Sequence, residues 1–281
     1  MISIKNVIIV CLSLFISNLI GGCSYSASKV TNENGVKDNL DIVIFKIGKA
    51  DSILLSMGDQ TVLIDTGEDE DGEEIIDYME KNKITMIDYL ILTHFDKDHV
   101  GGVDTILNEV EVLNVISPNY ESDSKDYKKY MVALEDHDIA PLKLTNVFIF
   151  KVGTAQFTID PPRKDTYSGD NDYSLVISVE HGKNRFLFAG DAEEKRLTEL
   201  IESGNLEHTL LKVPHHGRYN DKSTEFFTLI HPKYAVITSS DKNPEEKEVI
   251  DVLKQLGTEV YVTRNGDILI FSDGESLRIN Q

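Results

Sequence analysis

The chain has 281 residues and a formal net charge of −20, from 28 lysines and arginines against 48 aspartates and glutamates. Hydrophobic residues make up 41% of it, too many for a disordered acidic segment, and two cysteines are too few for a disulfide framework or a cysteine-based zinc ribbon. The acidity also argues against a protein that wraps nucleic acid with its general surface, because phosphate binding requires clustered lysine and arginine.

The first 23 residues are typical of an export signal. Lys5 precedes an apolar stretch from Val7 to Ile20, which is shorter than the roughly 20 residues of a membrane-spanning helix. The ending Ile20-Gly21-Gly22-Cys23 resembles the lipobox of bacterial lipoproteins. This resemblance implies lipidation of Cys23 and a secreted, membrane-anchored lipoprotein, on the outer face of the cytoplasmic membrane or in the cell envelope. An uncleaved anchor or an ordinary signal peptide is the alternative.

Three segments follow from this interpretation. Residues 1–22 are a signal peptide of the lipoprotein type, and residues 23–39 are the lipidated cysteine and a flexible tether rich in serine and asparagine. Residues 40–281 form a single folded domain, since no low-complexity linker divides them.

Extended and helical patterns alternate along that domain. In chain order, the first half predicts strands at 41–47, 52–56 and 61–65, a helix at 73–83, a strand at 88–93, a helix at 103–110, a strand at 112–116 and a helix at 126–138. The second half predicts strands at 147–150, 156–159, 174–179 and 185–188, a helix at 192–203, a strand at 209–213, a helix at 223–230, a strand at 234–238, a helix at 245–256, and strands at 259–263 and 268–271. This order favours an α/β fold of packed sheets with helices outside.

Four potential metal ligands follow the apolar strand that ends at Leu92. They are His94, Asp96, Asp98 and His99. Positions 94, 96 and 98 would point one way in an extended chain, and Gly101-Gly102 would then let the chain turn. Imidazole and carboxylate together suit zinc or a harder ion such as manganese. A surface salt-bridge cluster is the alternative, but the exit of a buried strand favours a metal site.

Two later strands also end at potential ligands. Asp191 comes just after the strand at 185–188, and His215-His216 follow the strand at 209–213. Three strand ends that deliver ligands together would form a metal cleft at one edge of the sheets. Asp191 has a competing interpretation as the N-cap of the helix at 192–203.

These motifs together resemble the metallo-β-lactamase fold superfamily, and most closely the soluble hydrolase domain of ComEC-type competence (DNA-uptake) proteins. The matching residues run in family order over about residues 41–240: Gly48-Lys49-Ala50-Asp51-Ser52, Leu63-Ile64-Asp65-Thr66-Gly67, the segment 93–102, Asn171 to Val176, Gly190-Asp191 and Val213 to Gly217. The resemblance implies a four-layer αβ/βα sandwich, with two mixed sheets and a metal site at one sheet edge.

The resemblance also implies a ligand set for one or two divalent ions. His94 and Asp96 would hold the first metal, with Asp191 as the bridge, and Asp98, His99 and His215 would hold the second. His215 is favoured over His216 because it comes first after Val213-Pro214. His216 would then contact the substrate or support a ligand, and Asp65 would orient a ligand.

The chain departs from the family pattern at the first metal. Asp96 stands where the broad superfamily has histidine, as is common in the competence branch, and the usual third histidine is missing. Asn171 or Asp172 is the candidate replacement. More oxygen ligands weaken the preference for zinc and favour manganese or magnesium. A single-metal site made by residues 98, 99, 191 and 215 is the alternative.

The expected activity is hydrolysis by a metal-bound hydroxide, with Asp98 or Asp191 accepting a proton. The competence resemblance favours an anionic phosphodiester substrate, including DNA strands, whereas the net charge predicts no extended nucleic-acid-binding surface. Two alternatives remain open: a hydrolase of another bond, such as a lactone or a cell-wall ester, and a non-catalytic surface binding protein with a degraded metal site.

Overall fold

A computed structural model describes residues 39–281 of the chain. The predicted signal peptide, the predicted lipidation site Cys23 and the tether up to residue 38 lie outside the described residues. No helix within residues 39–281 is long and apolar enough to cross a membrane.

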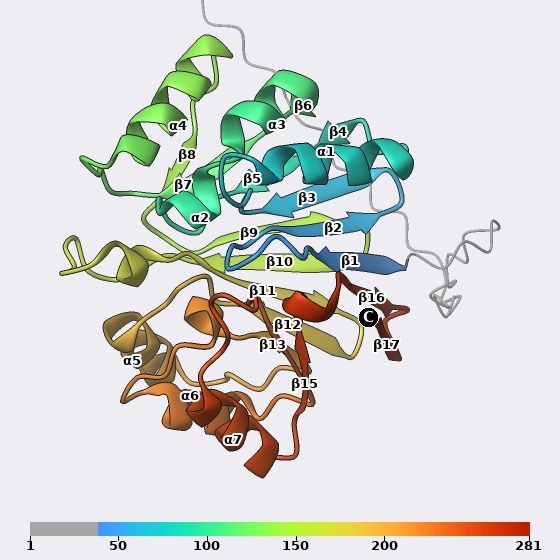
Figure 1. Cartoon of the computed structure of the whole chain (residues 1–281), viewed down its shortest axis with the longest axis vertical. Coiled ribbons are helices and arrows are strands. Elements are labelled where there is room, and N and C mark those ends of the chain that lie inside the picture. Colours follow the sequence, from blue (N-terminus) through green and yellow to red (C-terminus); the bar gives the residue numbers. More distant parts are fainter. Residues whose placement is uncertain (1–38) are drawn as a thin grey trace, which may run out of the picture. The chain divides into compact units, whose positions relative to one another are not determined.

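Two large mixed sheets form the centre of the fold (Figure 1). The eight-stranded sheet has the order β17-β16-β1-β2-β3-β5-β7-β8, antiparallel from β17 to β3 and parallel from β3 to β8. Its strands are β1 (Leu40–Ile44), β2 (Ile53–Met57), β3 (Gln60–Ile64), β5 (Tyr89–Ile91), β7 (Val115–Pro118), β8 (Leu142–Leu144), β16 (Ile268–Ser272) and β17 (Leu277–Asn280).

The seven-stranded sheet also contains both antiparallel and parallel strand pairs. Its order is β15-β14-β13-β12-β11-β10-β9, antiparallel from β9 to β12 and parallel from β12 to β15. Its strands are β9 (Phe148–Val152), β10 (Ala155–Asp160), β11 (Val176–His181), β12 (Asn184–Phe188), β13 (Leu210–Lys212), β14 (Tyr234–Ile237) and β15 (Glu259–Val262). A further small sheet pairs β4 (Met86–Ile87) with β6 (Glu111–Val112).

Helices cover the outer face of each sheet (Figure 1). Beside the first sheet lie α1 (Asp71–Lys81), α2 (Lys97–Val100), α3 (Val103–Glu109) and α4 (Lys125–Asp136), and beside the second lie α5 (Glu194–Ser203), α6 (Ser223–Ile230) and α7 (Lys247–Gln255). Short 3₁₀ turns are η1 (Asp170–Tyr173), η2 (Pro214–Gly217) and η3 (Thr263–Asn265).

Three apolar layers hold these elements together. Side chains that alternate along the strands, such as Ile42 and Leu55, meet Phe157 and Phe186 between the sheets. Residues on the opposite faces of the strands pack against the helices in two further clusters. The predicted four-layer αβ/βα sandwich is thereby confirmed.

The sequence pattern missed the shortest elements. Strands β4, β8 and β17 have two to four residues, too few for the alternation of apolar residues to stand out. The four-residue helix α2 was also missed, because its residues are the polar ligands themselves. Asp98 therefore lies on a helical turn, and the prediction that residues 94 to 98 are all extended is wrong.

Candidate metal centre

The 93–102 segment forms one side of the site. It leaves the end of β5, runs through Thr93 and His94, and turns into α2, which carries Asp98 and His99. The chain turns at Gly101-Gly102 as predicted, but both residues have ordinary right-handed backbone angles, so the turn does not need the conformational freedom of glycine. A Cβ on Gly101 would lie 2.6 Å from the backbone N of Asp69, and one on Gly102 would lie 2.4 Å from the carbonyl oxygen of Thr66. Both glycines therefore let α2 pack closely on the loop after β3.

The other side comes from the second sheet. Asp191 follows β12, and His215-His216 form the turn η2 directly after β13. Both histidines have left-handed backbone angles, with φ of 48° and 51°, and so does Asp65 at 58°. Left-handed backbone is disfavoured for histidine and accumulates at functional sites.

Four of these side chains converge on one small region. Asp98, His99, Asp191 and His216 each place one ligand atom within 4.8 Å of the others. The Nε2 atom of His216 lies 3.1 Å from Asp191 Oδ2 and 3.4 Å from Asp98 Oδ2, and the Nε2 atom of His99 lies 3.3 Å from Asp191 Oδ1. This grouping brings together residues from α2, the end of β12 and η2.

The His94 ring joins the cluster from the β5 side. It is fully buried, and its centroid lies 4.1 Å from that of the His99 ring. Its Nε2 atom is 3.6 Å from Asp96 Oδ2, and the Asp96 side chain is 44% exposed. The neighbouring His94 ring, the largest effect, lowers the pKa of Asp96 and outweighs burial, which would raise it. The side chains of His94 and Asp96 are thus neighbours, and their shared role as ligands of one ion stays a prediction.

Hydrogen bonds orient all three buried imidazoles in the same way. Asp65 Oδ2 lies 2.8 Å from His99 Nδ1 and can only accept, so Nδ1 carries the proton. Thr93 donates its hydroxyl proton to Asp65 and can accept one from His94 Nδ1 at 3.1 Å.

The third buried imidazole, His216, is oriented by a similar pair of hydrogen bonds. Thr238 donates to Asp51 Oδ1 at 2.7 Å and accepts from His216 Nδ1 at 2.9 Å. With Nδ1 as the donor, the Nε2 atom of each neutral imidazole carries a lone pair. Acceptors placed behind Nδ1 in this way fix the orientation of histidines that bind metals.

The inward atoms have no hydrogen-bond partner. Among the described residues, His94 Nε2, His99 Nε2, His216 Nε2 and Asp191 Oδ1 are buried and unsatisfied. Each buried polar atom of this kind costs about 1–3 kcal/mol, so four of them in neighbouring side chains call for a ligand. The residues present fit one or two divalent cations, because imidazole and carboxylate are the ligands of zinc and manganese.

A buried ion pair beneath the cluster could not be predicted from the sequence. The Lys212 ammonium at the end of β13 contacts Asp51 Oδ2 and lies 3.8 Å from Asp191 Oδ1, and none of these side chains is more than 3% exposed. Asp51 and Lys212 are 161 positions apart in the sequence, so no local pattern links them. Their pairing ties the first sheet to the second under the metal centre.

Opposite charges outweigh burial throughout the cluster. Burial opposes the charged form of His99, but Asp191 and Asp65 raise its pKa well above the usual value. Burial would likewise raise the pKa of Asp191, but His216 and His99 hold it well below the ordinary range. Protons therefore compete with a metal ion for the imidazoles, and metal binding should release protons.

The structure separates the two histidines of η2. His216 is buried within the four-residue cluster, whereas the His215 side chain is 22% exposed and its Nε2 atom is 3.9 Å from Asp191 Oδ2. His215 Nδ1 lies 3.0 Å from Glu193 Oε1, and its Nε2 lies 3.4 Å from the amide nitrogen of Asn171. The expected preference for His215 over His216 thus differs from the arrangement found here, because the left-handed turn swings the second ring inward.

Two other candidate roles differ from expectation. Asp172 Oδ1 accepts from the backbone N–H of Arg196 at 3.0 Å, so Asp172 supports the start of α5 and is not turned to the cluster. Asp191 is not the N-cap of that helix, since the cap position is Glu193. The alternative interpretation of Asp191 as a capping residue is therefore wrong.

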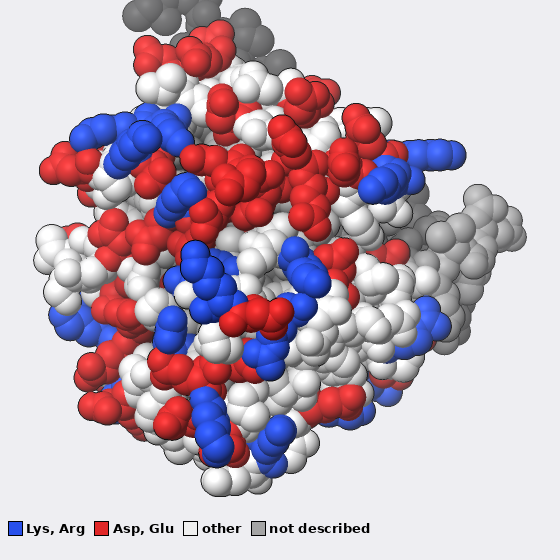
Figure 2. Space-filling model, viewed as in Figure 1, with Lys and Arg blue, Asp and Glu red and all other residues white. Residues whose placement is uncertain are grey.

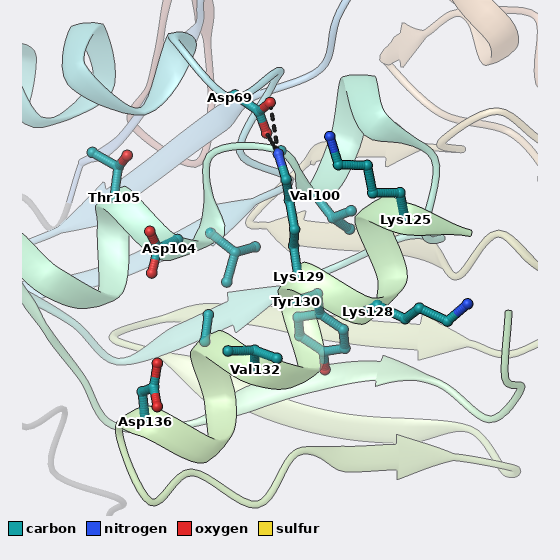
Figure 3. Close-up of a pocket in the computed structure, with 13 residues that line it drawn as sticks. Asp69, Val100, Asp104, Thr105, Lys125, Lys128, Lys129, Tyr130, Val132 and Asp136 are labelled. Atoms are coloured by element: carbon teal, nitrogen blue, oxygen red, sulfur yellow. Dashed lines mark hydrogen bonds and ion pairs between the residues drawn. The ribbon is translucent and has the colours of Figure 1, made fainter. Parts of the chain in front are cut away.

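A separate cavity of about 680 Å³ lies between α3 and α4 (Figure 3). Val103 and Tyr130 line it, and Lys129 reaches across its opening to Asp69, with Nζ–Oδ distances of 2.9 and 3.0 Å. No residue of the metal cluster lines this cavity.

Comparison with known families identifies the architecture. The sequence profile of the metallo-β-lactamase superfamily matches residues 47–240, which include every residue of the metal cluster. The chain belongs to the metallo-β-lactamase superfamily. The fold and its cluster of candidate ligands support a metal-dependent hydrolase that uses divalent ions.

Relatives of this superfamily member include a protein named for competence, as predicted: Competence protein ComA of Neisseria gonorrhoeae is 24% identical over 72% of this chain and 27% of that protein. The chain is 28% identical to ComE operon protein 3 of Bacillus subtilis over 81% of its length, and 30% identical to Recombination protein 2 of Haemophilus influenzae over 78%. It spans only 32% and 26% of those two proteins. The solved metallo-β-lactamase fold protein YhfI of B. subtilis has a TM-score of 0.57 at 12% identity, covering 83% of this chain and 100% of that one, which shows the shared fold.

Proposed function

We propose that this chain is a lipid-anchored, extracytoplasmic, metal-dependent phosphodiesterase, with DNA strands among its candidate substrates. The observation that carries the hydrolase is that the Nε2 atoms of three neighbouring imidazoles and one Asp191 oxygen are all buried and unsatisfied among the described residues. The choice of a phosphodiester is supported by relatives named for competence and recombination. A degraded site would not keep acceptors behind all three imidazoles.

Two overlapping ligand sets are available. His94, Asp96 and Asp191 would hold one ion, and Asp98, His99, Asp191 and His216 would hold the other. Bound divalent ions would acidify a water molecule and neutralise negative charge on the substrate. The oxygen-rich first set favours manganese or magnesium, whereas the second suits zinc or manganese.

In this proposal, Asp98 takes up the proton released in the reaction. Hydrolysis joins a water oxygen to phosphorus and breaks the bond to the leaving oxygen, so one water proton goes to a base and the other ends on the leaving alcohol. The Asp98 side chain is 18% exposed, whereas that of Asp191 is 3% exposed and lies against Lys212. Asp98 can therefore pass a proton to solvent, while Asp191 serves mainly to hold the ions together.

The charge distribution restricts the form of a nucleic-acid substrate. On the face shown in Figure 2, acidic side chains gather over the upper half and the left side, and lysine and arginine side chains form only small groups. An extended duplex would meet this acidic surface, whereas a short or single-stranded phosphodiester could reach the metal centre alone. The proposed lipid on Cys23 would hold the domain at the membrane surface, in the cell envelope where a competence function operates.

Substrate profiling with the metal-loaded protein tests this proposal. We expect cleavage of bis(p-nitrophenyl) phosphate and of single-stranded DNA with manganese or zinc, and weaker cleavage of duplex DNA. Hydrolysis of a lactone or a neutral ester without any phosphodiester cleavage would refute the phosphodiesterase. Cleavage of the small diester without DNA cleavage would remove DNA from its substrates.

A further inference from the structure

Two lysine ammonium groups contact carboxylates of the metal centre, and they differ in their access to solvent. Lys212 is fully buried in its pair with Asp51. The Lys49 Nζ atom donates to Asp98 Oδ2 at 3.2 Å, and the Lys49 side chain is 28% exposed. Lys49 thus stands at the opening of the centre, on a carboxylate that belongs to the ligand cluster.

The backbone beneath Lys49 is firmly held. The N–H of Asp51 donates to the carbonyl oxygen of Asp98 at 3.0 Å, and the N–H of Gly67 donates to the carbonyl oxygen of Asp51 at 2.9 Å. Ala50 is fully buried. The loop between β1 and β2 therefore fixes where the side chain begins, while the four-carbon stem of lysine remains free to move its ammonium.

Other cations near the mouth are paired with acids outside the cluster. Lys97 pairs with Glu68 at 2.6 Å, and Arg218 pairs with Glu246 at 3.1 Å. Lys49 differs from them because its partner, the Asp98 carboxylate, would itself bind a divalent ion. A dication on Asp98 repels a neighbouring ammonium, so the Lys49–Asp98 pair is weakened when the centre is loaded.

We propose that Lys49 is a substrate-binding residue that selects anionic phosphodiesters over neutral esters. With the centre loaded, its ammonium turns from Asp98 to a non-bridging phosphate oxygen of the substrate, for which a neutral ester has no counterpart. This inference rests on the proposed phosphodiesterase activity and names Lys49 as the residue that makes it selective for anionic substrates. It also accounts for phosphate binding by a protein of net charge −20, because one mobile cation beside the ions replaces a broad basic surface.

The experiment compares Lys49→Ala and Lys49→Arg with wild type. Metal content is measured by mass spectrometry, binding of dimethyl phosphate to the metal-loaded protein by calorimetry, and kcat and KM with bis(p-nitrophenyl) phosphate and with p-nitrophenyl acetate. Lys222→Ala is the matched control, since Lys222 is 34% exposed and pairs with Glu225 on α6. We expect Lys49→Ala to raise KM for the diester and Kd for dimethyl phosphate about tenfold, as for loss of one charged hydrogen bond.

The remaining readouts separate binding from structure. In Lys49→Ala, we expect unchanged metal content, kcat within about twofold and unchanged kinetics on the neutral ester; Lys49→Arg should restore most diester binding. Unchanged diester KM and dimethyl phosphate Kd in Lys49→Ala, or a loss of bound metal, would overturn the inference. If wild type cleaves no phosphodiester, the proposed function fails by itself, and the dimethyl phosphate affinities still decide whether Lys49 binds the anion.

Discussion

Asp65→Asn is the substitution that most directly tests how the imidazoles are oriented. The Asp65 carboxylate accepts from Thr93 N–H at 2.7 Å, from the Thr93 hydroxyl at 2.8 Å and from His99 Nδ1 at 2.8 Å. An asparagine keeps the shape and tolerates the left-handed backbone at this position, where φ is 58°. The substitution removes the Oδ2 acceptor that the Thr93 hydroxyl and His99 Nδ1 share.

The size of the effect follows from these three bonds. If the amide oxygen of the new asparagine still accepts from Thr93 N–H, its NH₂ group faces two other donors, the Thr93 hydroxyl and His99 Nδ1–H. His99 avoids this donor–donor contact when its proton moves from Nδ1 to Nε2. That proton occupies the atom that should bind the metal. We expect metal affinity to fall by about 10–100-fold, as for other acceptors behind ligating histidines, which equals about 1.4–2.7 kcal/mol.

Metal titration and thermal unfolding together form the assay. One buried donor left without a good acceptor should cost about 2 kcal/mol, so the metal-free variant should melt about 4–8 °C below wild type. Asp59→Asn, the same chemical change at an exposed turn, should leave both quantities unchanged. Metal affinity within threefold of wild type in Asp65→Asn would refute the proposed orientation of His99.

Three further predictions concern single side chains. His216→Ala should weaken metal binding by more than about a hundredfold and His215→Ala by less than about tenfold, and the reverse order in a metal titration would contradict the assignment of the buried histidine. Burial, helped by the neighbouring Glu70 and Glu74, raises the pKa of Asp71 to about 6, so this carboxyl favours folding at acid pH and its contribution is lost as pH rises from about 4 to 6. Asp71→Asn should therefore stabilise the protein by ~1 kcal/mol at pH 7.5 and hardly at pH 4, with equal gains in urea unfolding at both pH values as the contrary result. Burial lowers the pKa of His208 to about 4, so the unfolded chain is protonated first and stability is lost as pH falls from about 6.5 to 4. His208→Gln should flatten the dependence of the urea midpoint on pH in that window, whereas an unaltered dependence would show that another group causes the acid sensitivity.

The layers of the fold and part of the site follow from local sequence patterns. The continuous apolar run before Thr93 predicted a buried strand, and polar residues at its exit marked His94, Asp98 and His99 as ligands. These ligands could be predicted from a short stretch of sequence because they directly follow the end of the strand. Asp191 was found in the same way, after β12.

The parts that were missed depend on contacts across the sandwich. Lys212 meets Asp51 only because β13 and the loop after β1 approach each other in space, and Thr238, which supports His216, lies directly after β14. Whether His215 or His216 points inward is decided by two left-handed residues in succession, and a histidine pair gives no local signal for that backbone. Asp172 was a ligand candidate because the usual third histidine is missing and its segment matches the family motif, and the sequence does not show that this carboxylate supports the start of α5.

Metal stoichiometry of the protein purified without chelator tests the central claim most directly. Mass spectrometry should find one to two divalent ions per chain in wild type after equilibration with manganese or zinc, and a loss of bound metal in a variant with both His99 and His216 replaced by alanine. A wild-type protein that binds neither metal, or a double variant that keeps its full metal content, would contradict the assignment of this cluster as a metal centre.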